Sequence, residues 1–154
     1  MKEKYSQLTI RPANRQDALL LFNWANDKTV RKNAIHSEEI KWENHIEWFN
    51  NRIENPSVQI FILEDKGNPL GQIRYEKKAD YWIIDYSIDI KHRGNGLGQY
   101  IIKETMAYFT NTCLCAKVKI DNIASYSVFV KLAFKKVNEY ELNGSLFLDF
   151  KKKL

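Results

Sequence analysis

A glycine-rich segment set between a strand and a helix constrains this chain more than any other feature. The run from Tyr81 to Ile90 is rich in aromatic and β-branched residues, which favours a strand. It leads into Arg93-Gly94-Asn95-Gly96-Leu97-Gly98, after which apolar residues recur at helical spacing. Glycines let a backbone approach a ligand closely, and free amides at a helix N-terminus point at an anion. The segment predicts a phosphate cradle, with a flexible turn as the alternative.

Two other glycine motifs fit this segment poorly. A P-loop needs Lys and then Ser or Thr after its last glycine, whereas Gly98 is followed by Gln99 and Tyr100. A dinucleotide-binding fold places its glycines after the first strand of the domain. Here the glycines come past the midpoint of the chain. The pattern therefore favours another kind of phosphate site.

The first half of the chain predicts a short strand, several helices and a hairpin. Residues 8–12 indicate the strand, Asn14 is a candidate N-cap for a helix that ends near Trp24, and Asp27 is a candidate cap for a second, short helix. Apolar residues between 42 and 53 recur every three or four positions, as on one face of an amphipathic helix. Residues 58–63 and 70–76 flank a dense turn signal and indicate a hairpin.

The second half adds a helix from Leu97, a strand over 116–120, a helix over 124–132 and a final hairpin. Asn143-Gly144 is a favoured pair for a type I′ turn, because both central residues need positive φ. This order predicts one α/β domain over residues 1–154, built on a single mixed sheet.

Composition narrows the class of ligand. The 24 Lys and Arg residues exceed the 19 Asp and Glu, giving a net charge of +5, which suits an anionic ligand. No basic run approaches a nucleic-acid arm, so we expect no nucleic-acid partner. Two cysteines, Cys113 and Cys115, predict neither a disulfide framework nor a zinc site, and we expect no metal. With no apolar leader or membrane-spanning stretch, we expect a cytoplasmic protein without a membrane partner.

The segment from Ile88 to Gly98 resembles the acetyl-CoA motif of the GNAT superfamily of N-acetyltransferases, Arg/Gln-x-x-Gly-x-Gly/Ala. A second stretch, Asn122-Ile123-Ala124-Ser125 followed by Phe129 and Lys131-Leu132-Ala133-Phe134, resembles that family's Asn-x-x-Ser…Tyr…Lys-Leu-Gly-Phe. The resemblance implies an α/β fold with a mixed, mostly antiparallel sheet of about seven strands, a central splay and about four helices. It also implies acetyl-CoA as the co-substrate.

Two helices in the first half resemble a subgroup of that family. Trp24-Ala25-Asn26-Asp27 with Arg31, and Trp42-Glu43-Asn44-His45 with Trp48, are similar to acetyltransferases of surface-sugar pathways such as that of pseudaminic acid. This implies a nucleotide-linked aminosugar as the acceptor. We expect a monomer or homodimer. Two alternatives remain: an N-terminal protein acetyltransferase of the ribosomal-protein type, and a module that binds acyl-CoA without catalysis.

The family resemblance also assigns cofactor contacts. It implies that the pantetheine lies between the diverging strands and pairs with backbone near Ile88 and Ile90. The amides of residues 93–98 would hold the pyrophosphate, these being Arg93, Gly94, Asn95, Gly96, Leu97 and Gly98. Asn122 would hydrogen-bond the pantetheine, with Ser125 near the entrance. Phe129 stands where many members carry a Tyr that protonates the leaving thiolate, so Tyr126, Ser127 or a water are the alternatives.

The catalytic and acceptor residues follow from chemistry and from their expected positions. Asp85 on the central strand, and His45 or His36 near the acceptor side, are candidate general bases. A packed, hydrogen-bonded histidine is the alternative for His45, and an exposed strand residue is the alternative for Asp85. Trp24 could stack on a base or sugar or lie in the core, and Arg31 and His36 could meet a diphosphate.

Overall fold

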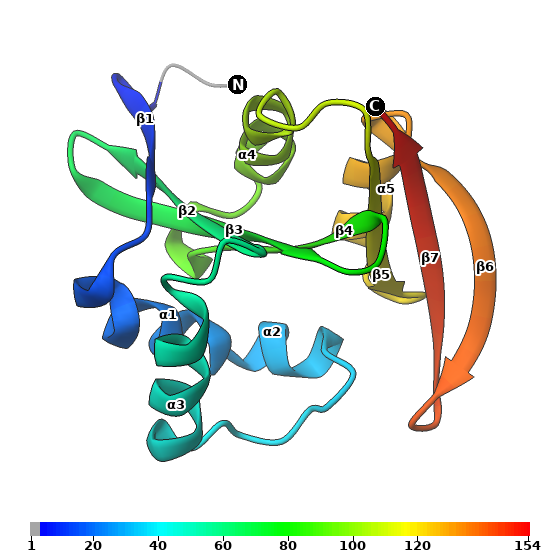
Figure 1. Cartoon of the computed structure of the whole chain (residues 1–154), viewed down its shortest axis with the longest axis horizontal. Helices are drawn as coiled ribbons and strands as arrows, with labels where there is room; N and C mark the ends of the chain where they lie inside the picture. Colours follow the sequence, from blue (N-terminus) through cyan, green and yellow to red (C-terminus); the bar gives the residue numbers. More distant parts are fainter. Residues whose placement is uncertain (1–3) are drawn as a thin grey trace.

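A seven-stranded sheet in the order β1-β2-β3-β4-β5-β7-β6 is the frame on which the helices pack (Figure 1). The computed structural model describes residues 4–154. Neighbouring strands are antiparallel except β4 and β5, which are parallel. The strands are β1 (Leu8–Pro12), β2 (Val58–Asp65), β3 (Asn68–Lys77), β4 (Tyr81–Ile88), β5 (Cys113–Lys119), β6 (Lys135–Leu142) and β7 (Ser145–Lys153).

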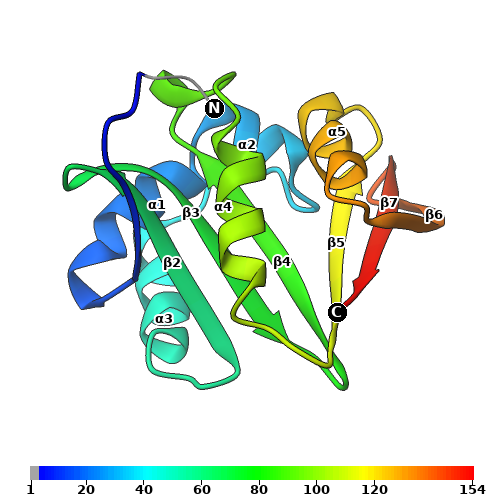
Figure 2. The same cartoon turned by 90° about the horizontal axis from the view of Figure 1, so that it is seen from above.

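Helices cover both faces of the sheet. One face carries α1 (Ala18–Ala25), α2 (Lys28–Asn33) and α3 (Trp42–Arg52), and the other carries α4 (Leu97–Met106) and α5 (Ile123–Lys131) (Figures 1 and 2). Two short 3-10 segments, η1 (Arg15–Asp17) and η2 (Ile90–His92), precede α1 and follow β4. Because strand side chains alternate between faces, the sheet has two cores. Phe49 and Ile62 lie in the core under α1 and α3, and Tyr75 and Ile101 lie in the core under α4.

The predicted fold class and element order are confirmed. Asn14 caps η1 in a capping box with Asp17, and Asp27 caps α2 by accepting bonds from the amides of Thr29 and Val30. The β6–β7 turn has φ of 52° at Asn143 and 77° at Gly144, as the Asn-Gly pair predicts.

β4 ends at Ile88, two residues before the predicted end. The physical reason lies in Asp89. Its side chain accepts a bond from the amide of Lys91 and so starts the 3-10 turn.

β4 and β5 separate part-way along their length, and this separation is the expected central splay of the sheet. Their pairing runs from Tyr81↔Cys113 to Ile84↔Ala116 and then stops. Beyond that point β4 continues beside β3 and β5 continues beside β7. Figure 2 shows the two strands starting together and diverging toward the N-terminus of α4.

The link between β1 and η1 generates a stability prediction. The Arg11 guanidinium binds both carboxylate oxygens of Asp17 at 2.8 Å, and the amide of Asn14 adds a bond of 2.7 Å. Hydrogen bonding to Arg11 lowers the pKa of Asp17 below its ordinary 3.8. We expect Asp17→Asn to lower the free energy of unfolding by about 2–3 kcal/mol at neutral pH. The loss should shrink as pH falls through the carboxyl range, because the native Asp17 is then protonated too.

Urea unfolding at several pH values measures this difference. Glu54→Gln is the matched control, since Glu54 pairs with Arg15 at 2.9 Å at an exposed site where ion pairs contribute little. Equal losses in both variants would contradict the role assigned to Asp17.

Candidate active site

A cavity of about 910 Å³ lies where β4 and β5 diverge. At one end it is lined by Gly94, Gly96 and Gly98 at the start of α4. At the other end it reaches Arg31 and His36, beyond the opposite face of the sheet. The cavity therefore connects the predicted phosphate cradle with the predicted acceptor residues.

Main-chain groups of β4 point into the gap. The amide of Asp89 bonds the carbonyl of Leu70, directly opposite on β3, at 2.8 Å. Because alternate residues of an antiparallel strand turn their amides to the same neighbour, Ser87 and Asp85 also face β3. Tyr86 and Ile88 consequently direct theirs toward β5, where pairing has ended. The gap thus offers unpaired amides to an extended ligand or to a developing oxyanion.

The glycines shape the cradle at the start of α4. Gly94 and Gly96 have φ of 77° and 79°, a region that other residues adopt only with strain. Gly96 is the N-cap and has no side chain to accept the first helical amides, so these stay available to an anion. A Cβ at Gly98 would lie 2.9 Å from Cε2 of Tyr86. The chemistry of these groups fits a pyrophosphate.

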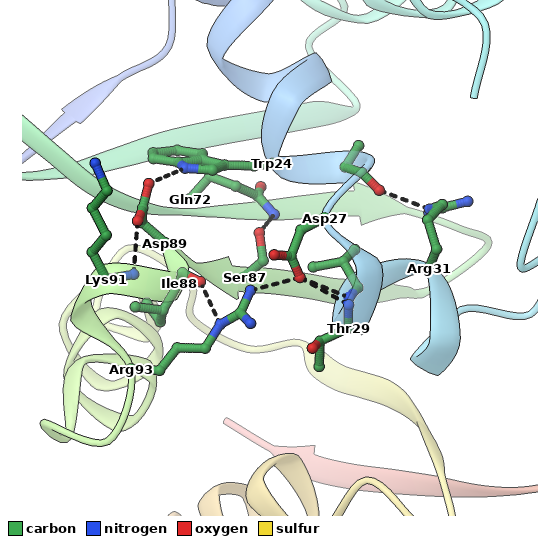
Figure 3. Close-up of polar contacts among 12 residues, drawn as sticks. Trp24, Asp27, Thr29, Arg31, Gln72, Ser87, Ile88, Asp89, Lys91 and Arg93 are labelled. Atoms are coloured by element: carbon green, nitrogen blue, oxygen red, sulfur yellow. Dashed lines mark hydrogen bonds and ion pairs between the residues drawn. The ribbon is translucent and has the colours of Figure 1, made fainter. Parts of the chain in front are cut away.

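The Arg93 side chain points away from the cradle. Its Nε donates to the carbonyl of Ile88 at 2.9 Å, and its Nη2 donates to Asp27 at 2.9 Å (Figure 3). Burial would raise the pKa of Asp27, but Arg93 and two amides outweigh it and lower that pKa. The Arg93 side chain therefore ties the end of β4 to the N-terminus of α2.

Asn95 and Ile90, two of the expected cofactor contacts, lie outside the cavity lining. The Asn95 side chain donates to the carbonyls of His92 and Arg93 at 3.0 and 3.2 Å, so it shapes the loop. Ile90 lies in η2 with 65 % of its surface exposed, and it does not line the cavity. Because β4 ends at Ile88, the structure leaves Ile90 beyond the paired strand. Leu97 is buried and lines the cavity.

Trp24 is a core residue that also braces the site. Only 7 % of its surface is exposed, and its Nε1 donates to Asp89 at 2.9 Å (Figure 3). Burial would raise the pKa of Asp89, but bonds from Trp24 and the amide of Lys91 lower it. The indole touches the cavity wall, yet its packing leaves little of the ring for stacking on an acceptor.

The N-terminus of α5 brings the second motif to the same gap. Asn122 caps α5 by accepting a bond from the amide of Ser125 at 3.3 Å, which leaves its Nδ2 able to donate to a ligand. Ser125 Oγ lies 2.9 Å from the hydroxyl of Tyr86. Phe129 is 2 % exposed and packs edge-to-face on Tyr86. Asn122, Ser125 and Phe129 of the second motif thus line the cavity together with Tyr86.

The acceptor end combines charged and aromatic groups. Asp85 has 57 % of its side chain exposed and lies 3.6 Å from Nη1 of Arg74. Arg31 donates through Nε to the carbonyl of Ala25 at 2.7 Å and through Nη1 to that of His36 at 2.9 Å. Burial lowers the pKa of Arg31. His36 itself is exposed at the cavity edge.

His45 also lines the cavity, but its ring is packed among aromatic side chains. It is 4 % exposed, its Nε2 lies 2.8 Å from the carbonyl of Ala18, and its ring stacks on Trp48 and Phe49. Burial lowers the pKa of His45, so the neutral form is favoured. Because its Nε2 is engaged, His45 fits the packed, hydrogen-bonded role better than that of a base.

Sequence reasoning did not assign to the site several residues that line it, among them Gln72, Arg74, Tyr86 and Lys117. Gln72 and Arg74 face Ser87 and Asp85 across the β3–β4 register. Strand alternation places Tyr86 on the opposite face from Asp85. That alternation was readable from the sequence, but the pairing partners were not.

Comparison with known proteins identifies the family. Residues 7–135 match the acetyltransferase (GNAT) domain family. The chain belongs to the GNAT acetyltransferases. It is accordingly an acetyl-CoA-dependent N-acetyltransferase, and we propose the cradle and the gap as its acetyl-CoA site.

Solved structures share the fold of this acetyltransferase. A spermidine N-acetyltransferase from Vibrio cholerae, solved with CoA and spermine, is 18 % identical with a TM-score of 0.85, over 96 % of each chain. A candidate phosphinothricin N-acetyltransferase is 22 % identical with a TM-score of 0.82, over 96 % of this chain and 99 % of that one. A ribosomal-protein alpha-N-acetyltransferase solved with coenzyme A is 14 % identical, with a TM-score of 0.82, over 97 % and 95 %.

None of these three is described as acting on a sugar nucleotide. A search of curated proteins finds no significant match. Across residues 4–154, no helix is long and apolar enough to cross a membrane. The same described range holds no group of three or more His, Cys, Asp or Glu placed to bind a metal ion.

The cradle generates a binding prediction. Gly96→Asp adds charge and bulk beside the free amides of α4, so we expect at least a tenfold weaker affinity for acetyl-CoA, measured by calorimetry. Gly67→Asp is the matched control, because Gly67 has a similar φ of 80° with open space around it and lies in the β2–β3 turn away from the cavity. An affinity unchanged in Gly96→Asp, or lowered equally in both, would contradict the cradle assignment.

Proposed function

We propose that this acetyltransferase acts on the primary amine of a small acceptor that also carries phosphate or carboxylate, with a nucleotide-linked aminosugar as the leading candidate. The charge of the cavity lining carries the proposal. Among the described residues that line the cavity, Asp85 is the one carboxylate, whereas Arg31, Arg74 and Lys117 are cations of the acceptor half. Such a lining attracts an anionic acceptor.

The same lining disfavours a polyamine. A polyamine carries several positive charges, and in this cavity most of them would lie near Arg or Lys side chains and not near a carboxylate. Lys117 is itself held by Tyr140 at 3.0 Å and Asp149 at 3.5 Å, and its pKa is raised by the hydrogen bond to Tyr140. It therefore stays charged beside the cavity.

The wall of the acceptor half supports a compact acceptor over a protein N-terminus. The loop after α2 is tied back by Arg31, which donates to the carbonyl of His36. The β6–β7 turn reaches the same loop, since Asn143 donates to the carbonyl of Ile35 at 3.1 Å. These bonds hold the loop after α2 and the β6–β7 turn together beside the cavity, which would narrow the approach for a peptide chain.

Acetyl transfer would proceed by direct attack of the amine on the thioester. Asp85 projects from β4 on the acceptor side and would take the proton from the amine. The amides of Tyr86 and Ile88 would stabilise the developing oxyanion in the gap. The bound ternary complex supplies proximity, which lowers the barrier for the two-substrate step.

A panel of acceptors tests the acceptor class. We expect release of free coenzyme A thiol with aminosugar nucleotides, and far slower release with spermidine or an N-terminal peptide. Arg31→Gln should raise KM for the anionic acceptor about tenfold, with less effect on kcat. Lys28→Gln is the matched control, because it removes the same charge from an exposed site on α2 outside the cavity lining. Preference for spermidine would overturn the proposal.

A second variant tests the role of Asp85. Asp85→Asn keeps the shape of the side chain and removes the proton acceptor, so the single-turnover rate should fall about a hundredfold with unchanged acetyl-CoA affinity. Asp80→Asn provides the same charge change at an exposed position in the β3–β4 turn, outside the cavity lining. A rate within twofold of the parent protein would leave Asp85 with a structural role only.

A further inference from the structure

Thioester cleavage leaves a sulfur that needs a proton, and the cavity offers few groups to supply it. Attack by the amine expels the coenzyme A thiolate, and a positioned acid speeds such steps. The ring of Phe129 has no proton to give. Tyr126 has 38 % of its surface exposed and does not line the cavity, so it is poorly placed.

Tyr86 spans the gap in which the thioester must lie. It stands on β4, two residues past the last β4–β5 pair at Ile84↔Ala116. Its hydroxyl lies 2.9 Å from Ser125 Oγ on α5, the helix that follows β5. The phenol therefore extends from β4 across the gap to α5, the helix that follows β5. A ligand between the strands would lie against it.

The Tyr86 ring is held in place by its neighbours. A Cβ on Gly98 would approach within 2.9 Å of Cε2, so the ring fills the space that this glycine leaves. The ring of Phe129 packs on it at 6.0 Å between centroids and 73° between planes. These contacts fix the direction of the hydroxyl without a charged partner.

From this geometry we infer that Tyr86 donates the proton to the coenzyme A sulfur, and that Ser125 is the positioning residue that orients the phenol. The inference concerns the acetyl-transfer step and is independent of the acceptor. Burial raises the pKa of Tyr86, the hydrogen bond with Ser125 opposes this rise, and the Asp85 carboxylate adds to it. The phenol is therefore protonated at neutral pH, as an acid must be.

The proton balance of the step is complete. The amine nitrogen bonds the acetyl carbon, the carbon–sulfur bond breaks, and the sulfur takes the phenolic proton. The phenolate regains a proton from Ser125 Oγ, which is resupplied by water from the cavity mouth. The proton lost by the amine goes to Asp85 and then to solvent. No oxidant, reductant or metal is required.

Tyr86→Phe is the direct test, assayed as single turnover of bound acetyl-CoA with the best acceptor of the panel. We expect the rate to fall at least thirtyfold while acetyl-CoA affinity stays within about twofold. Tyr126→Phe is the matched control and should retain the parent rate. Ser125→Ala should cost less than Tyr86→Phe, because the phenol remains. A parent-like rate in Tyr86→Phe with intact folding would overturn the inference.

A measurement without an acceptor separates this inference from the proposed acceptor class. With 3-fluorotyrosine incorporated at position 86, we expect the fluorine resonance to shift on addition of coenzyme A and to shift much less with desulfo-coenzyme A. Equal shifts with the two ligands would show that the sulfur does not meet the phenol, and would overturn the inference. This probe keeps the ring and the hydroxyl, so it also serves if Tyr86→Phe folds poorly.

Discussion

The loss of pairing between β4 and β5 is the constraint on which the rest of this structure depends. Each strand stays paired on its other side, with β3 and β7 respectively, so both remain held in the sheet beyond the opening. Gly71 assists, because a Cβ there would lie 2.7 Å from the carbonyl oxygen of Ser87. The end of β4 can therefore lie close against β3. The opposite edge of β4, which faces the gap, remains open to the cofactor.

Two braces tie the acceptor helices to the cofactor loop. Trp24 on α1 bonds Asp89, which starts η2, and Arg93 bonds both Asp27 at the start of α2 and the carbonyl of Ile88 (Figure 3). Arg31 on α2, which we propose meets the acceptor, is one helical turn beyond Asp27. The wall that would meet the acceptor is thus positioned by the same residues that shape the pyrophosphate cradle. If cofactor binding orders the loop that follows β4, the same bonds would also order the wall that faces the acceptor.

Most of the fold, and the position of the proposed cradle, could be predicted from local patterns in the sequence. Asn14, Asp27 and Asn143-Gly144 act through neighbours a few residues away, so their roles were predictable from spacing. The direction of the Arg93 side chain depends on Asp27, 66 residues away, and no local pattern reports it.

For the same reason, the sequence left two roles open for Trp24, which could stack on a ligand or lie in the core. Its partner Asp89 lies 65 residues away, and only the folded sheet brings the two together. The acceptor remains the least predictable part of the site. It depends on charges that β3, β4, β5 and the loop after α2 bring into one cavity.

Alternation along β4 explains how four consecutive residues can serve two substrates. Asp85 and Ser87 project toward the acceptor helices, whereas Tyr86 and Ile88 project toward α4 and α5 and turn their amides into the gap. A proton taken from the amine by Asp85 and a proton given to the sulfur by Tyr86 would then be handled on opposite faces of the sheet. Neither proton would need to cross the strand, and each face could exchange with solvent by its own route. The sheet itself would keep the path by which Asp85 releases the amine proton apart from the path that resupplies Tyr86.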